Sequence, residues 1–257
     1  MLEWMDLHAH LNMLEEGPEE ALRLAREVGV VKVATIGTEP EDLPLVLALA
    51  EKNYPNVFCT LGIHPHEGRV YTAEIGAFIE ANVSKPWVIA IGEIGLDYHY
   101  DQSPREEQKS AFRAQLDIAV RTNMPIQIHT RDADEDTIMI LKEYAGRVKG
   151  IIHCFTGTPW LAQEALALGY NISISGVVTF KNAESLREIV RNLPMDRIHV
   201  ETDSPFLAPM PMRGRKNTPA FVVHTAKFVA ELKGVTLEDL CTATRENALK
   251  MFPKIQW

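Results

Sequence analysis

The stretch Trp4-Met-Asp-Leu-His-Ala-His10 decides the fold class, because an apolar run ends there in two histidines. Side chains alternate between the two faces of a β-strand, so His8 and His10 project from the same face. Both common parallel α/β architectures bind ligands at the carboxyl ends of their strands. The stretch therefore predicts the first strand of a parallel sheet, with polar groups at its ligand-binding end.

Seven further apolar, β-rich runs follow along the chain. They are Val30–Gly37, Val57–His64, Val88–Gly92, Pro125–Thr130, Gly150–Phe155, Tyr170–Ser175 and Ile198–Asp203. Helix signals lie between and after them: starts at Pro18, Ser103-Pro104 (with Ser103 in a capping box) and Thr158-Pro159, and helical stretches at Pro219–Leu232 and Thr236–Met251. Strands that alternate with helices indicate parallel strand pairs joined by helical crossovers.

Polar residues at the strand ends distinguish a closed barrel from an open sheet. They stand at or directly after six of the eight runs: His8, His10, His64, Glu93, His129, His153 and Asp203. An open sheet uses mainly the loops at one switch point, whereas a closed ring brings all its strand ends together. The length of 257 residues is close to the roughly 250 typical of such a ring. We expect a (β/α)8 TIM barrel, with residues 1–257 forming a single domain.

The composition excludes several classes of protein. Hydrophobic residues make up 46% and charged residues 24%, as in ordinary globular proteins, and no apolar run approaches the roughly 18 residues that span a bilayer. Three widely separated cysteines do not form a disulfide framework, and the amino terminus lacks a signal-peptide pattern. We expect a cytoplasmic protein without membrane attachment. Cys59 and Cys154 are predicted to be small core residues, with Cys154 facing the helices.

The net charge of −9 excludes a protein that coats nucleic acid through bulk positive charge. Local phosphate contacts remain compatible with it. Arg131 begins the loop after a predicted strand, where its guanidinium could bind phosphate or form a salt bridge with Asp132 or Asp134. The segment Arg213–Lys216 carries three cations in four residues, which either follow a nucleic-acid backbone or are simply solvated.

Six of the strand-end residues form a candidate metal site: His8, His10, Glu93, His129, His153 and Asp203. A lone histidine there is usually a hydrogen-bonded core or turn residue. Six converging groups, however, cost several kcal/mol each if they are buried without partners. They exceed the needs of one tetrahedral ion and suit two divalent cations about 3.5–4 Å apart, bridged by a carboxylate. Asp6 and Glu201 lie one layer deeper, as orienting groups or as a buried polar pair.

Several sequence blocks resemble the signature motifs of the TatD family of metal-dependent hydrolases. The blocks are His8-Ala-His10, Gly62-Ile-His-Pro65, Gly92-Glu-Ile-Gly-Leu-Asp97, Ile128-His-Thr-Arg131, His153-Cys-Phe-Thr-Gly157 and Glu201-Thr-Asp-Ser-Pro205. They occur in the family's order, and the resemblance runs from residue 6 to residue 252. It implies a TIM barrel of the amidohydrolase superfamily with deoxyribonuclease activity, commonly 3′-to-5′ exonucleolytic. DNA is then the expected substrate, with RNA as an alternative, and no obligate protein partner is implied.

The resemblance also implies a role for each residue. His8, His10 and Asp203 would hold one metal, His129 and His153 the second, and Glu93 would bridge them. His64 would face the substrate near the scissile phosphate. Magnesium or manganese is implied for activity, whereas four histidines also suit zinc. One departure is Thr218, which stands where an acidic residue is common and affects only fine loop contacts.

The expected chemistry is hydrolysis by a water that two metals activate. Asp203, as a ligand that touches this water, is our candidate general base. Tyr98, His99 and Tyr100 could stack a terminal base, although capping the barrel is the simpler interpretation.

Two other functions remain open. One is hydrolysis of a different ester or amide on the same barrel, by a small-molecule amidohydrolase or an aminoacyl-tRNA deacylase. Such relatives often bridge their metals with a lysine at the fourth strand, where this chain has Glu93. The other is a binding protein without turnover, which the complete set of predicted ligands disfavours.

Overall fold

The computed structural model describes residues 2–257, in which eight strands form one sheet and pair in parallel in chain order. The strands are β1 (Trp4–Ala9), β2 (Val30–Ile36), β3 (Val57–Leu61), β4 (Val88–Asp97), β5 (Ile126–Arg131), β6 (Gly150–Ile152), β7 (Asn171–Ile174) and β8 (Ile198–Val200). The segment after β8 returns to β1: the N–H of His10 donates to the Ser204 carbonyl at 2.8 Å, and that of Asp203 donates to the His8 carbonyl at 2.9 Å. The predicted (β/α)8 barrel is confirmed.

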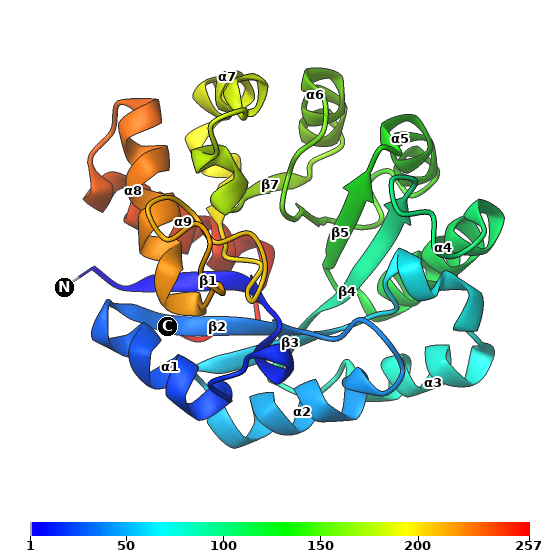
Figure 1. Ribbon diagram of the computed structural model, residues 1–257. Helices are drawn as coiled ribbons and strands as arrows, with labels where there is room; N and C mark the ends of the chain where they lie inside the picture. Colours follow the sequence, from blue (N-terminus) through cyan, green and yellow to red (C-terminus); the bar gives the residue numbers. More distant parts are fainter. Residues whose placement is uncertain (1) are drawn as a thin grey trace.

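The helices surround the strands in chain order, as Figure 1 shows. They are α1 (Pro18–Glu27), α2 (Asp42–Asn53), α3 (Ala73–Asn82), α4 (Arg105–Thr122), α5 (Asp134–Glu143), α6 (Pro159–Ala167), α7 (Glu184–Asn192), α8 (Val222–Lys233) and α9 (Leu237–Met251). None of the helices within residues 2–257 has the length and apolar content that crossing a bilayer requires.

Two predicted helix starts have different outcomes. Thr158 is the N-cap of α6, because its hydroxyl accepts the N–H of Leu161 at 3.2 Å. Ser103 does not cap α4, whose N-cap is Pro104. The Ser103 hydroxyl instead donates to the carbonyl of His66 at 2.6 Å, which ties the loop after β4 to the loop after β3.

The core fills the space between the strands and the helices. Ile91, Ile126 and Ile152 of the strands are fully buried, as are Leu116 and Leu161 of the helices. Burial of each such side chain contributes about 1.5–3 kcal/mol to folding. The strand ends are thereby held on a rigid frame.

Four strands next to predicted site residues end at least three residues away from their predicted ends. β4 extends to Asp97 rather than ending at Gly92. β3 ends at Leu61 rather than His64, β6 at Ile152 rather than Phe155, and β8 at Val200 rather than Asp203. Because β6 stops early and Cys154 has a positive φ of 41°, the strand alternation no longer applies to Cys154. Its side chain lines the cavity and lies 3.1 Å from the Ser175 hydroxyl, so the prediction that it faces the helices was wrong. Cys59 is fully buried, as expected.

Candidate metal centre and active site

The carboxyl ends of the strands surround a cavity of about 680 Å³. The side chains that the sequence placed at the strand ends gather here. Those that line the cavity are His10, His64, Glu93, His129, His153 and Asp203. His8 is fully buried, and its ring stacks on the His153 ring with centroids 3.8 Å apart.

Glu93 of β4 lies at the centre of this group. Its Oε1 is 2.7 Å from His153 Nε2, 2.9 Å from His129 Nδ1 and 3.4 Å from His64 Nε2. Its Oε2 points the other way and lies 3.4 Å from His8 Nε2. A single buried carboxylate therefore contacts imidazoles from strands on both sides of it.

Gln127 of β5 determines the tautomer of His8. The Gln127 amide nitrogen donates to the carbonyl of Leu7 at 3.0 Å, so its Oε1 is free to accept. This oxygen lies 2.9 Å from His8 Nδ1, which must donate the proton. A neutral His8 then presents a bare lone pair at Nε2. That atom is buried without a hydrogen-bond partner and faces the carboxylates of Glu93 and Asp203.

Carboxylates hold two further imidazoles in the same way. Glu201 Oε1 lies 3.2 Å from His153 Nδ1, and Asp97 Oδ2 lies 3.0 Å from His129 Nε2. In each case the outer nitrogen donates to a carboxylate, and the inner nitrogen of the neutral ring presents a lone pair toward Glu93. Hydrogen bonds of this kind hold metal-ligating histidines in most metalloenzymes.

The residues present fit divalent cations. Lone pairs of imidazoles and oxygens of carboxylates repel one another at these separations unless positive charge lies between them. Stacked, parallel imidazoles such as His8 and His153 also repel each other when both are protonated. Cations that bind the inner nitrogens remove both conflicts, and neutral imidazole with carboxylate is a common ligand set for transition metals.

The pKa shifts of His153 and Glu93 also indicate that this site favours positive charge next to its carboxylates. Burial lowers the pKa of His153, but the carboxylates of Glu93 and Glu201 outweigh it and raise that pKa well above its ordinary value. Burial raises the pKa of Glu93, but the imidazoles of His153, His64 and His8 outweigh burial and bring this pKa well below its ordinary value. His64 differs, since burial dominates and lowers its pKa to about 4.

His10 and Asp203 form the second part of the site, next to His8. Asp203 Oδ1 lies 3.4 Å from His10 Nε2 and 3.7 Å from His8 Nε2. Ligand atoms of these three residues lie within 4.8 Å of one another, as do those of His64, Glu93 and His129 and those of His8, His153 and Glu201. Glu201 contacts the outer nitrogen of His153, so the first two groups are the ones that could each hold an ion, with Glu93 in contact with both His8 and His129.

The two residues that we expected beneath the site behave differently. Glu201 contacts His153, and its Oε1 also accepts the N–H of Cys154 at 2.6 Å. Asp6 instead accepts the N–H of Thr202 at 2.9 Å, across the junction between β1 and β8. Burial raises the pKa of Asp6 to about 8, which is consistent with a structural role for this side chain.

The cationic residues also differ in their surroundings. Arg131 lines the cavity with its guanidinium carbon 4.9 Å from the centre of the Tyr100 ring. Its expected salt-bridge partners are engaged elsewhere, since Asp132 contacts His99 at 3.1 Å and Asp134 accepts from Thr158 at 2.6 Å.

In the predicted cationic segment, Arg213 stacks on Phe180 at 3.7 Å and Lys216 pairs with Glu15.

Tyr98 points toward the helices, because its hydroxyl donates to Asp136 of α5 at 2.6 Å.

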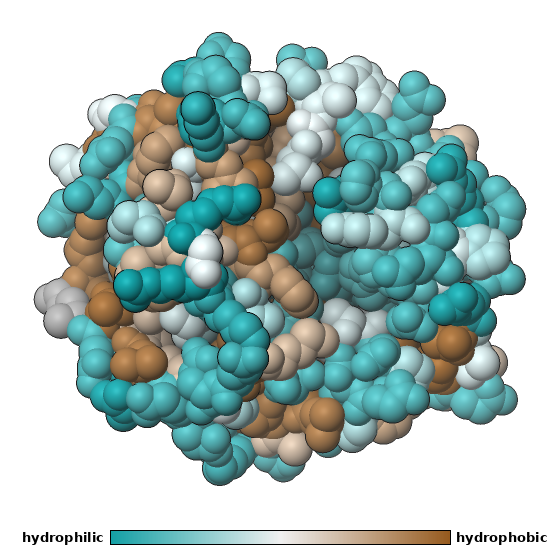
Figure 2. Space-filling view, in the orientation of Figure 1, coloured by the Kyte–Doolittle hydropathy of each residue, from teal (hydrophilic) through white to brown (hydrophobic). Residues whose placement is uncertain are grey.

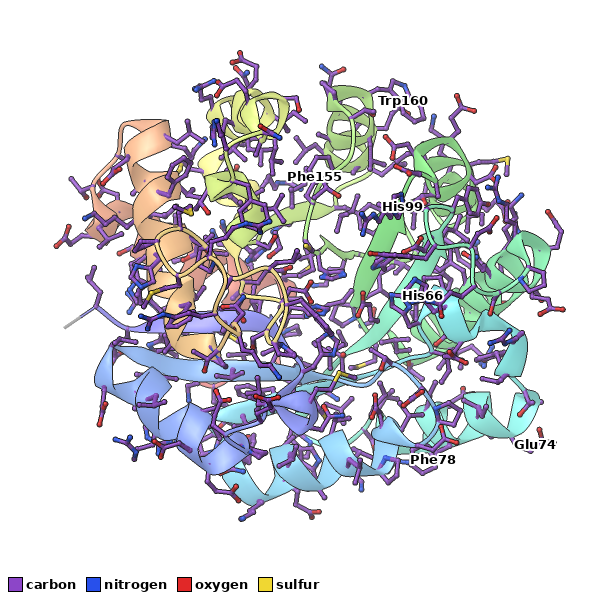
Figure 3. The ribbon with its side chains drawn as sticks, viewed as in Figure 1. His66, Glu74, Phe78, His99, Phe155 and Trp160 are labelled. Atoms are coloured by element: carbon purple, nitrogen blue, oxygen red, sulfur yellow. The ribbon has the colours of Figure 1, made fainter. Side chains whose placement is uncertain are left out.

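Sequence reasoning missed three residues of the site. Asp97 Oδ2 lies 3.0 Å from both His129 Nε2 and His66 Nε2, and Gln127 orients His8. Figure 3 shows His66 beside the opening at the ends of β4 and β5. The strand alternation could have identified Gln127, which stands two residues before His129. Asp97 ends the quoted family block Gly92–Asp97, but no role was predicted for it because the prediction ended β4 at Gly92.

The amino-acid sequence matches a known protein family over almost its whole length. The family model described as TatD related DNase matches residues 5–253. A Bacillus subtilis protein named uncharacterized metal-dependent hydrolase YabD is 41% identical over 250 residues, covering 96% of this chain and 98% of the relative. The Erwinia amylovora protein named 3′-5′ ssDNA/RNA exonuclease TatD is 35% identical over 240 residues, covering 91% and 93% of the two chains.

The fold of this chain also matches that of a solved structure. The crystal structure of YjjV, a TatD homolog from Escherichia coli, superposes with a TM-score of 0.91 at 28% identity and covers 98% of each chain. Both the sequence and the fold therefore match this family over nearly the whole length of the chain. The chain belongs to the TatD related DNase family of metal-dependent hydrolases.

Proposed function

We propose that this protein is a deoxyribonuclease that uses two divalent cations to release nucleotides from the 3′ end of DNA, with residues 1–257 acting as one hydrolase domain. The observation that carries the proposal is the position of Glu93, whose two oxygens face His8 on one side and His129 and His153 on the other. Family membership and the exonuclease name of the Erwinia relative support it. Single-stranded DNA is the preferred substrate in this proposal, and RNA is the alternative.

Each proposed ligand has a defined place. His8, His10 and Asp203 would hold one cation, His129 and His153 the other, and Glu93 would contact both. Such cations, when bound, lower the pKa of water and offset negative charge on the phosphate that is attacked. Imidazole and carboxylate together suit manganese or zinc, and the family suggests magnesium or manganese for DNA hydrolysis.

Side chains that line the cavity would accept the proton of the attacking water and bind the phosphates of the substrate. Asp203 accepts the proton of the attacking water in this proposal, because its carboxylate lines the cavity and accepts rather than donates. His64 lines the same cavity next to Glu93 and contacts the scissile phosphate. The Arg131 guanidinium binds a phosphate of the substrate through its two parallel N–H groups.

The test is a digestion assay with metal-free protein. A single-stranded oligonucleotide carrying a 5′ label is incubated after adding back magnesium, manganese or zinc. We expect products that shorten one nucleotide at a time from the 3′ end, and no products with a chelator present. His129→Ala should abolish the reaction, while His224→Ala, on the outer helix α8, should not.

Two further arms separate the alternatives. Asp203→Asn should lower kcat far more than it raises KM, and an unimpaired variant would reject the assignment of the general base. Parallel assays on small cyclic amides and on aminoacyl-tRNA test the other hydrolase activities. Turnover of one of these without release of nucleotides would refute the deoxyribonuclease proposal.

A further inference from the structure

The cavity above the candidate metal centre has two unlike walls. The loops after β7, β8 and β1, which are neighbours in the barrel, supply an apolar wall: Met13, Val177, Phe180, Phe206 and Leu207. The loops after β3 and β4 and the last residue of β5 supply polar side chains opposite to it, among them His66, Glu67, Tyr100 and Arg131. Figure 2 shows the same division, with hydrophobic residues gathered to the left of the central hollow and hydrophilic residues to its right.

Phe206 is the most exposed side chain of the apolar wall, with 51% of its surface accessible. Its backbone is nevertheless held at both ends. Its N–H donates to the carbonyl of Asp203 at 2.9 Å, and its carbonyl accepts from the side-chain amide of Asn217. The Phe206 and His10 rings form a T-shaped pair, with centroids 5.9 Å apart and an interplanar angle of 69°. An aromatic side chain on a hydrogen-bonded backbone therefore lines the cavity, beside a proposed metal ligand.

The opposite wall carries a cation. The Arg131 guanidinium carbon lies 4.9 Å from the centre of the Tyr100 ring, and the two neighbouring aspartates contact other residues. A ligand that fills the cavity therefore meets Phe206 and its apolar neighbours on one side, where Arg213 lies over the Phe180 ring, and the Arg131 guanidinium on the other. A nucleotide has this character, since its base is flat and aromatic and its phosphate is anionic.

We propose that the apolar wall is a binding subsite for the base of the 3′-terminal nucleotide, with Phe206 as the stacking platform. This inference rests on the proposed function and adds the element that selects an unpaired end. Stacking on one aromatic ring accepts every base, because every base has a π face. The 3′-terminal base of a duplex keeps one free face, but it is paired with the opposite strand and stacked on its inner neighbour. It therefore has to leave the helix before it can enter the cavity.

The test compares ordinary and abasic 3′ ends. Wild type, Phe206→Ala and Phe206→Trp are assayed on single-stranded oligonucleotides that end either in a normal nucleotide or in an abasic one. Phe78→Ala is the matched control, since Phe78 is an exposed aromatic residue on α3, away from His66 and the opening in Figure 3. Thermal unfolding of each variant shows whether the fold is retained.

We expect Phe206→Ala to raise KM for the normal end about 10-fold or more, with a smaller change in kcat, and Phe206→Trp to restore it. The wild type should lose a similar factor on the abasic end, where Phe206→Ala should cause no additional loss. If Phe206→Ala discriminates against the abasic end as strongly as the wild type does, the subsite is refuted while the nuclease stands. If the wild type releases nucleotides from neither substrate, the proposed function falls and this inference with it.

Discussion

Asp97 links two imidazoles through one oxygen. Its Oδ2 lies 3.0 Å from His129 Nε2 and from His66 Nε2, while its Oδ1 accepts the N–H groups of His99 and Tyr100. The carboxylate is fully buried, so it cannot exchange these donors for water. It therefore orients His129 for whatever the inner nitrogen of that ring binds.

Replacing Asp97 by Asn should weaken cation binding. The amide keeps the shape of the side chain but loses the negative charge that favours donation from His129, and changes at such outer partners typically cost 10–100-fold in affinity. Titration of the metal-free protein with manganese, followed by calorimetry, measures the loss. Asp101→Asn, which removes an exposed partner of Arg105, serves as the control and should leave the affinity unchanged. Equal affinities in both variants would contradict the role of Asp97.

A second buried imidazole makes a prediction about pH. His199 of β8 is fully buried beside the amide of Asn171, and burial lowers its pKa to about 3 from a usual 6.5. Between pH 3 and 6.5, His199 is therefore protonated in the unfolded chain and neutral in the folded protein. The stability from this group is complete above about pH 6.5 and falls by about 1.4 kcal/mol per pH unit as the pH decreases toward 3.

His199→Gln should remove this dependence. Urea unfolding at a series of pH values between about 7 and 4, with a chelator present, gives the free energy of unfolding of both proteins. The difference between wild type and variant should shrink steadily as the pH falls through this range. A difference that stays constant would show that His199 is not held neutral.

At the scale of the elements, the contact between β4 and β5 places Glu93 next to His129. Gly95 of β4 has a φ of +145°, and a Cβ on it would lie 1.9 Å from the carbonyl oxygen of His129. Only glycine allows the two strands to come this close. Gly95 of this motif is therefore explained by strand packing at the site.

Gly95→Ala should destabilise the protein by more than about 3 kcal/mol, because both the backbone angle and the space are unsuitable for a side chain. Gly146→Ala is a matched control: Gly146 also has a positive φ, of +73°, but no atom would lie within 4 Å of its Cβ. It should cost only about 1 kcal/mol. Thermal and urea unfolding of both variants test this, and equal losses would show that the close contact with β5 does not matter.

At the scale of the whole molecule, the chain is acidic and several of its carboxylates lie together at one end of the barrel. The chain has a net charge of −9, and the carboxylates of Glu93, Glu201, Asp97 and Asp203 all lie in or directly beneath the cavity region. Cations that bind the folded protein, and not the unfolded chain, add to its stability by mass action.

Divalent cations should therefore raise the melting temperature. A concentration about 100 times the Kd adds about 2.7 kcal/mol, which corresponds to roughly 5–10 °C for a protein of this size. Scanning calorimetry of metal-free wild type with and without manganese measures the shift. His153→Ala should lose most of it, and His224→Ala should keep it. A shift of the same size in both variants would place the stabilising ions elsewhere on the molecule.

The sequence predicted most of the fold, because its signals are local. The alternation of apolar runs and helix starts, such as Thr158-Pro159, depends only on neighbouring residues, and it was sufficient to count eight strands. The bounds were less accurate where a local signal competes with packing. β4 continues past Gly92 because β5 pairs with it as far as Asp97, and the positive φ at Cys154 turns that side chain into the cavity.

Taken alone, the sequence determined that histidines and carboxylates stand at the strand ends of a barrel, since strand periodicity and the order of the motifs are properties of the chain itself. Only the tertiary structure decided which partner holds each ring. Gln127 and His8 are 119 positions apart, and the 2.9 Å contact between them exists only once the barrel has closed. The two walls of the cavity arise for the same reason: Met13, Phe180 and Phe206 become neighbours because β7, β8 and β1 meet where the ring closes.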